Sequence, residues 1–444
     1  MDIKAVILAA GKGTRMKSIT TPKVLHQIMG KTLLGYVLDS VKNFASEEFV
    51  IVGHHAEEVE KFVNDNYKNA KTTLQTPQLG TGHAVSMVCP MLKNYDGMVL
   101  ILCGDTPLIT EETLKDFVDF HKSNNSDITV MSTIFENPTG YGRIIREEDN
   151  SLRCIVEEKD ATLEQKAIKE VNAGIYCLNW AKIKDAFSQL KSNNAQGEYY
   201  LTDIIAWGKA KNLNVNAYIL KDSDQIYGIN SRLNLAQASK MMNKRNLEKY
   251  MTNGVTIVDT DSTWISEDTE IGQDTIIYPF TYIEGKNKIG KNCKIGPCAH
   301  LRGDVEVCDN VKVGNFVEVK KSKISSNTNV GQLSYIGDSE LGEHVNIGAG
   351  TITANYNPLT KEKTKTVLKD NVKIGSNTVL VSPVTVEEGA NVGAGSIVTK
   401  NVPAWALALT RSPLKTGLNQ NLANKTKRRI ENISIRLFKL DKIF

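Results

Sequence analysis

The chain has 444 residues, more than one compact core usually holds, so we expect two or three domains. Its 54 Lys and Arg against 50 Asp and Glu leave a net charge of +4, too small for a nucleic-acid-binding protein. Seven cysteines without a C-x-x-C pair argue against zinc and favour free thiols in a reducing compartment. With no charged-then-apolar leader and no apolar run of membrane length, we expect a cytoplasmic protein that binds neither membrane nor nucleic acid.

The first predicted element is a strand at residues 3–8, which runs into Leu-Ala-Ala-Gly-Lys-Gly-Thr-Arg-Met at residues 8–16. Gly11 and Gly13 would let backbone N–H groups face an anion without a Cβ in the way. The cations that could neutralise this anion are Lys12, Arg15 and Lys23. A bare G-x-G is usually an ordinary turn, but a first strand followed by three cations favours a phosphate-binding loop.

Strands and helices alternate through residues 1–227. Apolar runs predict strands at residues 49–53 and 98–103. Amphipathic spacing predicts helices at residues 32–44, 56–66 and 110–122. This alternation indicates an α/β domain with a mostly parallel, Rossmann-like sheet, whose ligands bind beyond the carboxyl ends of the strands. A linker helix within residues 228–252, with Ser231 as its N-cap, would separate it from a second domain at residues 253–444.

Two further loops of the first domain are candidates for ligand binding. Asp105 directly follows the strand at residues 98–103, where a carboxylate can hold the Mg²⁺ that accompanies a triphosphate. A turn-capping Asp before Pro107 is the alternative. Residues 75–84, Gln-Thr-Pro-Gln-Leu-Gly-Thr-Gly-His-Ala, contain amides that could recognise a base, although a plain loop explains them equally well.

A different pattern begins in the second domain, where an aliphatic residue recurs every six positions. Ten occur without a break: Ile265, Ile271, Ile277, Ile283, Ile289, Ile295, Leu301, Val307, Val313 and Val319. The register resumes at Ile324 and again at Ile374. Hexapeptide periodicity is typical of a parallel β-helix, in which stacked coils bury a column of aliphatic side chains. Residues 353–366 lack the register and predict an extruded polar loop, either functional or a tolerated insertion.

Residues 8–16 and the segment Pro22-Lys23-Val24-Leu25-His26 resemble the signature of nucleotidyltransferases that make nucleotide sugars. The chain most resembles the bifunctional N-acetylglucosamine-1-phosphate uridyltransferase/glucosamine-1-phosphate acetyltransferase family. This resemblance implies that the β-helix is left-handed and three-sided and that the protein is a homotrimer. The ligands that it implies are UTP, N-acetylglucosamine 1-phosphate, glucosamine 1-phosphate and acetyl-CoA, with Mg²⁺ as cofactor.

For the N-terminal half, the resemblance implies transfer of UMP from UTP to N-acetylglucosamine 1-phosphate. Catalytic roles would fall to Arg15, Lys23 and Asp105, and Mg²⁺ binding to Asp105 and Asn230. UTP would be bound by Leu8, Ala10, Gly11, Gly13, Lys23, Gln78, Gly80 and Thr81. The sugar phosphate would be bound by Gly142, Glu157, Asn172 and Asn230. Residues 194–203 also match the family closely, and we interpret them as structural, as a helix cap and packing.

For the C-terminal half, the resemblance implies acetyl transfer to glucosamine 1-phosphate. The implied contacts are Arg302, Lys320, Tyr335, Asn346, Asn355, Tyr356, Lys363, Ser376 and Ala394. The chain departs from the family at Gln332, where the family has the histidine that takes a proton from the amine. Because an amide accepts no proton near neutral pH, this loss typically costs about 10²–10⁴-fold in rate. His300 and His344 do not occupy the matching position, and the basic, then apolar tail at residues 425–444 matches nothing in the family.

Three functions therefore remain open. The first is a bifunctional enzyme that acetylates glucosamine 1-phosphate and then uridylylates the product. The second is a uridyltransferase whose β-helix serves only as a trimerising or regulatory scaffold; Gln332 supports it, and the retained contact residues oppose it. The third is a pyrophosphorylase for another nucleotide or hexose 1-phosphate.

Overall fold

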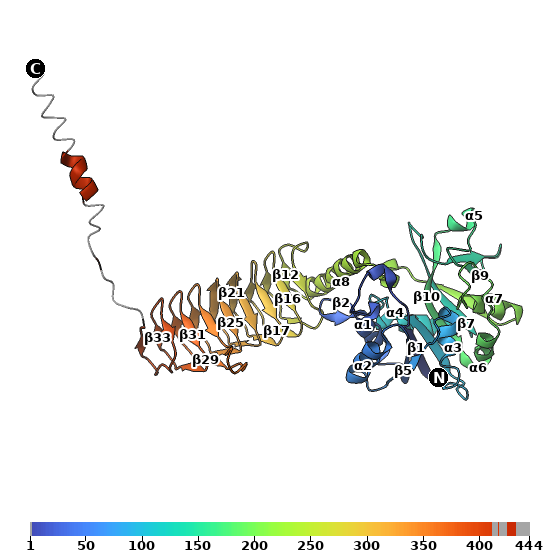
Figure 1. Ribbon diagram of the computed structural model, residues 1–444, viewed down its shortest axis with the longest axis horizontal. Helices are drawn as coiled ribbons and strands as arrows, with labels where there is room; N and C mark the ends of the chain where they lie inside the picture. The colour runs from blue at the N-terminus through green and yellow to red at the C-terminus, as the bar shows by residue number, and fades with distance from the viewer. Residues whose placement is uncertain (1, 411–415, 417–423, 432–444) are drawn as a thin grey trace, which may run out of the picture. The chain divides into compact units, whose positions relative to one another are not determined.

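The computed structural model describes residues 2–410, 416 and 424–431 (Figure 1). The chain divides into two compact units, Met1–Lys288 with Leu301–Asp304 and Ile289–His300 with Val305–Phe444. Most of the predicted tail at residues 425–444 lies outside the described residues. Residues 424–431, which are described, are helical. No helix in the described part of the chain is long and apolar enough to cross a membrane.

The first unit contains a sheet that, within the described residues, has nine strands in the order β11-β7-β10-β6-β1-β4-β5, with β8 beside β10 and β9 beside β8. Their bounds are β1 (Ile3–Leu8), β4 (Glu47–Val52), β5 (Ala70–Leu74), β6 (Met98–Cys103), β7 (Ile128–Ile134), β8 (Arg143–Arg146), β9 (Leu152–Val156), β10 (Glu170–Asn179) and β11 (Val215–Ile219). β1 runs parallel to β4 and β6, as predicted. β10 is antiparallel to β6, β7 and β8, so the sheet is mixed at this side. The cause is the β8–β9 hairpin, which returns the chain without the crossover helix that parallel pairing requires.

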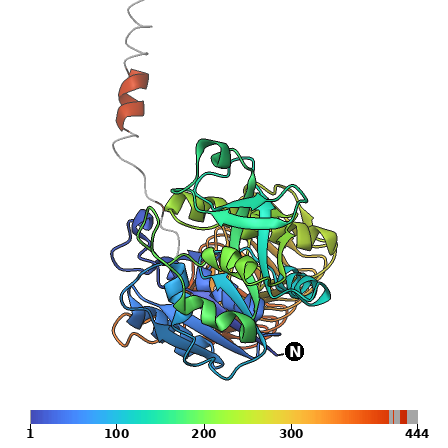
Figure 2. The ribbon, with the colours of Figure 1, turned by 90° about the vertical axis from the view of Figure 1, so that its right-hand side faces the viewer.

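Helices cover both faces of this sheet (Figure 2). They are α1 (Leu33–Val41), α2 (Ala56–Asn66), α3 (Thr81–Ser86), α4 (Glu111–Ser123), α5 (Leu163–Lys166), α6 (Trp180–Ile183) and α7 (Asp203–Ala210), with short 3₁₀ turns η1 (Thr14–Met16), η2 (Lys23–Leu25), η3 (Lys184–Ser188) and η4 (Ser223–Ile226). β1 serves both cores, since Ile7 packs with α1, α2 and α4 and Val6 packs with α3, α6 and α7. The predicted helix at residues 56–66 is confirmed, whereas the one at 32–44 ends earlier, at Val41.

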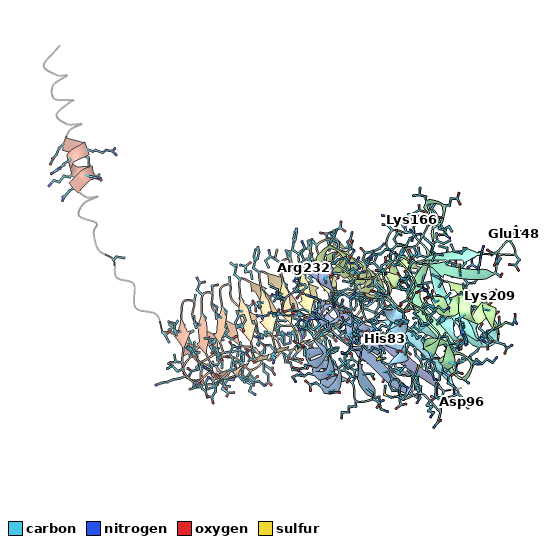
Figure 3. The ribbon with its side chains drawn as sticks, turned by 45° about the vertical axis from the view of Figure 1, so that its right-hand side comes forward. His83, Asp96, Glu148, Lys166, Lys209 and Arg232 are labelled. Carbon is cyan, nitrogen blue, oxygen red and sulfur yellow. The ribbon has the colours of Figure 1, made fainter. Side chains whose placement is uncertain are left out.

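The predicted linker helix is α8 (Arg232–Thr252), whose first residue is labelled in Figure 3. Ser231 accepts a hydrogen bond from the Asn234 N–H at 3.1 Å, which confirms it as the N-cap. The short strands that precede and follow α8 in this unit are β2 (Gln27–Ile28), β3 (Lys31–Thr32), β12 (Thr256–Ile257), β13 (Trp264–Ile265), β14 (Glu270–Ile271), β15 (Ile276–Ile277) and β16 (Tyr282–Glu284). β12 pairs with β15 and β13 with β16, both in parallel, as in coils of a β-helix.

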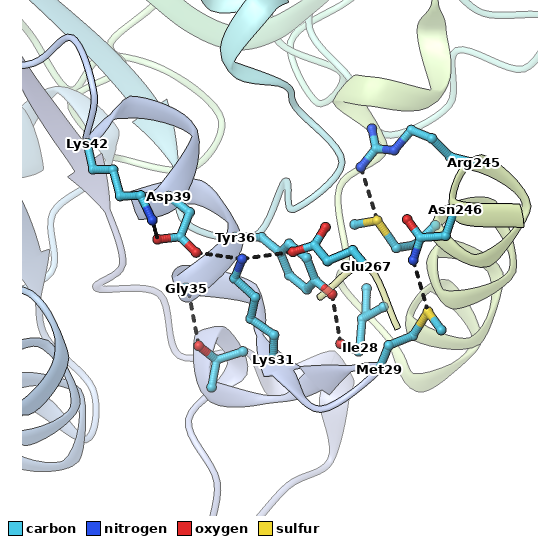
Figure 4. Close-up of polar contacts among 12 residues, drawn as sticks. Ile28, Met29, Lys31, Gly35, Tyr36, Asp39, Lys42, Arg245, Asn246 and Glu267 are labelled. Carbon is cyan, nitrogen blue, oxygen red and sulfur yellow. Dashed lines mark hydrogen bonds and ion pairs between the residues drawn. The ribbon is translucent and has the colours of Figure 1, made fainter. Parts of the chain in front are cut away.

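Polar contacts tie the first coil to the rest of the first unit. The Lys31 ammonium lies between the carboxylates of Asp39 and Glu267, at 2.5 and 2.9 Å (Figure 4). The Asn243 side chain donates to the Thr263 carbonyl at 2.8 Å, across the α8–coil boundary. The first coil is therefore built onto α8 and the hairpin β2–β3 by specific hydrogen bonds as well as by apolar packing.

The second unit is made of stacked short parallel strands. One face carries β18 (Lys294–Ile295), β21 (Lys312–Asn315), β24 (Asn329–Gln332), β27 (Asn346–Ile347), β30 (Lys373–Ile374), β33 (Asn391–Val392) and β35 (Leu407–Ala408). A second face carries β22 (Glu318–Lys320), β25 (Tyr335–Gly337), β28 (Ile352–Ala354), β31 (Val379–Val381) and β34 (Ile397–Val398). The third carries β20 (Val305–Val307), β23 (Lys323–Ile324), β26 (Ser339–Leu341), β29 (Thr366–Leu368) and β32 (Val384–Val386). Two further strands are β17 (Asn287–Ile289) and β19 (His300–Arg302). Three parallel faces agree with the expected left-handed β-helix of hexapeptide repeats.

The predicted aliphatic column forms the core of these coils. The hexad residues are buried, except that Ile271 is half-buried. Leu341 and Ile347 are buried too and continue the column through the region where the predicted register was interrupted. The predicted extruded loop leaves the coil between β28 and β29, and its Leu359 side chain is 91% exposed.

Candidate functional site

A cavity of about 500 Å³ lies at the carboxyl ends of β1 and β6. It is lined by Leu8, Ala9, Ala10, Gly11, Lys12, Gly13, Thr14, Lys23, Val24, Gln75, Gln78, Gly80, Thr81, Ala84, Cys103, Asp105 and Glu198. All the residues predicted to bind UTP are in this set, together with Asp105. They come from segments up to about a hundred positions apart in the sequence and meet because parallel strands end at one edge of the sheet.

The glycine-rich loop leaves room for the lysine that follows it. Gly13 has a φ of 60°, and a Cβ at this position would lie 2.7 Å from the Cβ of Lys23. Nothing lies within 4 Å of a Cβ at Gly11, so the loop is open to a ligand there. Arg15 is exposed on η1 and does not line the cavity, because Met16 takes the buried position of this turn. A catalytic role for Arg15 stays a prediction.

The two predicted magnesium ligands face one cation. The Lys23 ammonium forms an ion pair with the Asp105 carboxylate and donates to Asn230 Oδ1 at 3.3 Å. The Ile229 N–H donates to the Asp105 carbonyl at 3.0 Å, which fixes Asn230 beside this pair. Both Lys23 and Asp105 are largely buried, with side-chain exposures of 13% and 18%.

This donor set fits Mg²⁺. It offers one carboxylate and one amide oxygen, and no group of three His, Cys, Asp or Glu that could hold a metal occurs among the described residues. Mg²⁺ commonly takes only one or two protein ligands and completes its shell with substrate phosphates and water. A site of this kind suits an ion that arrives with a nucleoside triphosphate.

The proposed base-binding loop is held by residues 194–203. The Tyr199 N–H donates to the Leu79 carbonyl at 2.8 Å, and the Leu201 N–H donates to Thr81 Oγ1 at 3.1 Å. Packing and a helix cap were expected of this segment, and it does supply the residue at the N-cap of α7, but without a side-chain hydrogen bond. Thr202, at the N-cap position of α7, makes no side-chain cap and donates instead to Glu157 at 3.3 Å. Glu198 lines the cavity, a contribution that the sequence analysis missed because it interpreted residues 194–203 as structural.

Three residues predicted to bind the sugar lie together, just before β8, just after β9 and on β10. The Asn172 N–H donates to the Gly142 carbonyl at 2.9 Å, and a Cβ at Gly142 would lie 3.4 Å from Glu157 Oε2. Burial raises the pKa of Glu157, and neighbouring carboxylates such as Asp160 raise it further. The cluster reaches the metal ligands through Tyr141, whose hydroxyl accepts a hydrogen bond from the Gly228 N–H at 3.5 Å.

Cys103 lies between this cluster and the cavity, a placement that the sequence did not indicate. Its thiol lines the cavity and donates to the Gly174 carbonyl at 3.6 Å. Burial raises the pKa of Cys103 to about 12, and the nearby Asp105 carboxylate adds to the effect. The thiol is therefore neutral near pH 7 and acts as a packing group.

In the second unit, three predicted acetyltransferase residues lie along one edge. Gln332, Ser376 and Ala394 each stand two positions after a buried aliphatic residue of the first face. Hydrogen bonds between successive coils keep the equivalent positions stacked, from the Asn377 N–H to the Ala349 carbonyl at 2.7 Å and from the Gly395 N–H to the Ser376 carbonyl at 2.8 Å. Gln332, Ser376 and Ala394 are exposed at this edge.

The other predicted residues of this half are more dispersed. Lys320 lies opposite Gly337, and the Asn355 amide donates to the adjacent Asp338 carboxylate. Tyr335 begins β25, and Asn346 Oδ1 accepts a hydrogen bond from the Asn329 amide at 3.3 Å. Tyr356 and Lys363 form a β-bridge in the extruded loop. Arg302, in the first unit, forms an ion pair with Glu284 at 3.7 Å.

Neither histidine of this half takes the place of the missing base. His300 stacks under Glu318 and Tyr335, so it lies two coil rises, roughly 10 Å, below Tyr335. His344 is exposed at the corner before β27, whereas Gln332 is the last residue of β24. The coil position of the family histidine is therefore filled by Gln332 alone.

Known families match both halves of the chain. A nucleotidyl transferase model matches residues 4–244, and a model of bacterial transferase hexapeptide repeats matches residues 288–321 and 365–400. A solved structure of UDP-glucose pyrophosphorylase complexed with UDP-glucose is 20% identical, covers 55% of this chain and all of its own, and has a TM-score of 0.46.

Curated relatives match nearly the whole chain. The bifunctional protein GlmU of Acetivibrio thermocellus is 45% identical, over 92% of this chain and 95% of the relative. The corresponding proteins of Alkaliphilus metalliredigens and Clostridioides difficile are 43% and 44% identical, over 93% of this chain and 96% and 95% of their own length. Identity of this extent, across a nucleotidyltransferase half and a hexapeptide-repeat half, shows that the chain is an enzyme of the bifunctional GlmU family.

Proposed function

We propose that the N-terminal site transfers UMP from UTP to N-acetylglucosamine 1-phosphate and releases pyrophosphate. The observation that carries this proposal is the convergence of Lys23, Asp105 and Asn230 between the glycine-loop cavity and the cluster of predicted sugar ligands. Such an arrangement can hold a triphosphate and a sugar phosphate side by side. The relatives named as bifunctional proteins support the same reaction.

This reaction requires little covalent chemistry from the side chains of the protein. A sugar phosphate oxygen is already a nucleophile at neutral pH, so the enzyme needs chiefly to align two anions and neutralise their charge. Residues 11–14 line the cavity, and their backbone N–H groups could bind phosphate oxygens, while Lys23 can neutralise the α-phosphate. Asp105 and Asn230 would hold Mg²⁺, which when bound would neutralise further charge on the phosphates.

Pyrophosphate release tests this assignment. UTP, dTTP and ATP are each combined with N-acetylglucosamine 1-phosphate, glucosamine 1-phosphate and glucose 1-phosphate, with and without Mg²⁺. We expect the highest kcat/KM for UTP with N-acetylglucosamine 1-phosphate, and no release without the metal. A higher kcat/KM for another nucleotide or for glucose 1-phosphate would favour the third function considered above.

We propose further that the C-terminal half transfers acetyl from acetyl-CoA to glucosamine 1-phosphate without a protein base at position 332. Support comes from the retained residues along its coils and from the bifunctional relatives. Because only the neutral amine of the substrate attacks, CoA release should be slow at pH 7 and should rise with pH toward the pKa of that amine. Absence of CoA release at every pH would leave the β-helix as a scaffold only.

A homotrimer is part of the same proposal. Phe316 and Leu333 stand at successive corners of the second unit, each 61% exposed and with a φ of 56° and 52°. Large apolar side chains are rarely left exposed in a row, and this stack suits contact with other copies of the chain. Sedimentation velocity should show three chains per particle for the wild type and smaller particles for Phe316→Asp. A monomeric wild type would contradict the proposal.

A further inference from the structure

Arg143 occupies the centre of the predicted sugar-binding cluster. It follows Gly142 directly, and in the sheet it lies opposite Val156 of β9 and Val171 of β10. Those two strand partners immediately precede Glu157 and Asn172. Arg143 is therefore next to Gly142 in the chain, and its strand partners are next to Glu157 and Asn172, although Arg143 itself is not a predicted sugar ligand.

The Arg143 guanidinium is buried, with 1% of its side chain exposed. It forms an ion pair with Glu158 at 2.7 Å and donates to the Tyr141 carbonyl. It also donates to the carbonyl of Lys166 at 3.4 Å, at the end of α5. Figure 3 labels Lys166 on this part of the first unit. One cation thus ties together the loop before β8, the turn after β9 and the helix that leads to β10.

Glu158 completes the arrangement from the other side. The carboxylate oxygen that pairs with Arg143 also accepts a hydrogen bond from the Gly140 N–H at 3.2 Å. Burial by itself would raise the pKa of Glu158, but the hydrogen bonds from Gly140 and Arg143 outweigh it, and the pKa is lowered. Both ends of the Gly140–Gly142 loop are therefore fixed, one by Arg143 and one by Glu158.

Stability alone is a poor explanation for this pair. A buried ion pair commonly contributes no more than apolar residues of the same volume would. Arg143 also keeps Nε buried without a hydrogen-bond partner, which costs free energy. A planar cation with several donors is well suited, however, to holding carbonyl and carboxylate groups at fixed positions.

We propose that Arg143 and Glu158 are positioning residues that hold Gly142, Glu157 and Asn172 in the arrangement that binds the sugar 1-phosphate. The inference rests on the proposed function of the N-terminal site and adds a determinant of its sugar affinity. Neither residue lines the cavity predicted to hold the nucleotide. Loosening the Arg143–Glu158 ion pair should therefore weaken the binding of the sugar 1-phosphate. The binding of UTP and the rate of the chemical step should be unaffected.

Glu158→Gln tests this in the full-length protein, since it keeps the shape of the side chain and removes its charge. Initial rates of pyrophosphate release should show the KM for N-acetylglucosamine 1-phosphate raised at least tenfold. The KM for UTP and kcat should stay within twofold of wild type. Arg143→Lys retains the charge but loses the planar donors, and it should raise the KM for N-acetylglucosamine 1-phosphate in the same way. This variant provides the test if Glu158→Gln does not fold.

The matched control is a second ion pair that also involves an arginine of β8. Arg146 of β8 binds Glu170 of β10 through two hydrogen bonds of 2.7 and 2.6 Å, and it also donates to the Asn150 carbonyl at 2.9 Å, in the turn between β8 and β9. Glu170→Gln should lower the unfolding temperature yet leave both KM values within twofold. Equal rises of both KM values in Glu158→Gln, or the same rise in Glu170→Gln, would overturn the inference. A wild type that releases no pyrophosphate with any sugar 1-phosphate would instead refute the proposed function.

Discussion

The two candidate sites differ in how the chain brings their residues together. In the first unit, Lys23, Asp105 and Asn230 are separated by up to about 200 positions and meet at the end of a sheet. In the second unit, Gln332, Ser376 and Ala394 are equivalent positions of the repeated coils, with the coil of Ala349 between the first two. Convergence of distant loops gives a cavity lined by several segments, whereas the repeat gives an exposed edge.

The sites differ equally in the chemistry that each requires. Transfer to a phosphate nucleophile needs positioning and charge neutralisation, which several groups share. Acetyl transfer to an amine needs the removal of a proton, a task that the family assigns to one side chain and for which this chain has Gln332. A site in which several groups contribute to catalysis tolerates the substitution of one of them. A site that depends on one proton acceptor can lose most of its rate through a single substitution.

The largest expected effect is on the N-terminal site and should leave the C-terminal site unchanged. Asp105→Ala should reduce pyrophosphate release by at least about 10³-fold, because it removes the carboxylate predicted to hold Mg²⁺ and the partner of Lys23. CoA release from acetyl-CoA should be unchanged. Glu112→Ala, which removes an exposed carboxylate on α4, is the control and should keep full activity. Unchanged pyrophosphate release in folded Asp105→Ala would remove Asp105 from the metal site.

The second test acts on the other site. Gln332→His should increase CoA release with glucosamine 1-phosphate by about 10²-fold at pH 7, since it restores a proton acceptor at the family position. Pyrophosphate release should not change, and Gln332→Ala should give no gain. If Gln332→His gains nothing, the site lacks more than its base, and the sites differ in binding as well as in proton transfer.

A smaller effect concerns the stability of the first unit alone. His121 is buried on α4, its ring nitrogen Nδ1 is 2.8 Å from Thr129 Oγ1, and burial lowers the pKa of His121 to about 4. Because the unfolded chain binds this proton near pH 6.5, the stabilisation is complete above pH 6.5 and is lost as the pH falls toward 4, by up to about 3 kcal/mol. Urea unfolding monitored by amide hydrogen exchange should show this loss of stability in β6 and β7.

His121→Gln provides the control for that measurement. The substitution removes the titrating group, so the unfolding free energy of the first unit should depend less on pH between 6.5 and 4. The coils of the second unit should keep the same protection in both proteins over this range. An unaltered pH dependence in His121→Gln would assign the acid sensitivity to other groups.

Much of the fold could be predicted because its signals are local. Six-residue spacing identified the coils, and the aliphatic residues at those positions are buried. The amphipathic helix at residues 56–66 and the N-cap at Ser231 are found as expected. The direction of β10 could not be predicted, because strand pairing depends on the route of the chain through the β8–β9 hairpin.

The sequence by itself determined the two architectures, the glycine-rich loop, the acidic and amide residues offered as ligands, and the absence of histidine at position 332. Periodicity, turn residues and residue type are properties of short segments, so they can be recognised without coordinates. Only the tertiary structure decided that Lys23 contacts both Asp105 and Asn230, that Arg15 is exposed and does not line the cavity, and that Arg143 forms an ion pair with Glu158. These relations join segments far apart in the chain, and packing of the whole unit sets them.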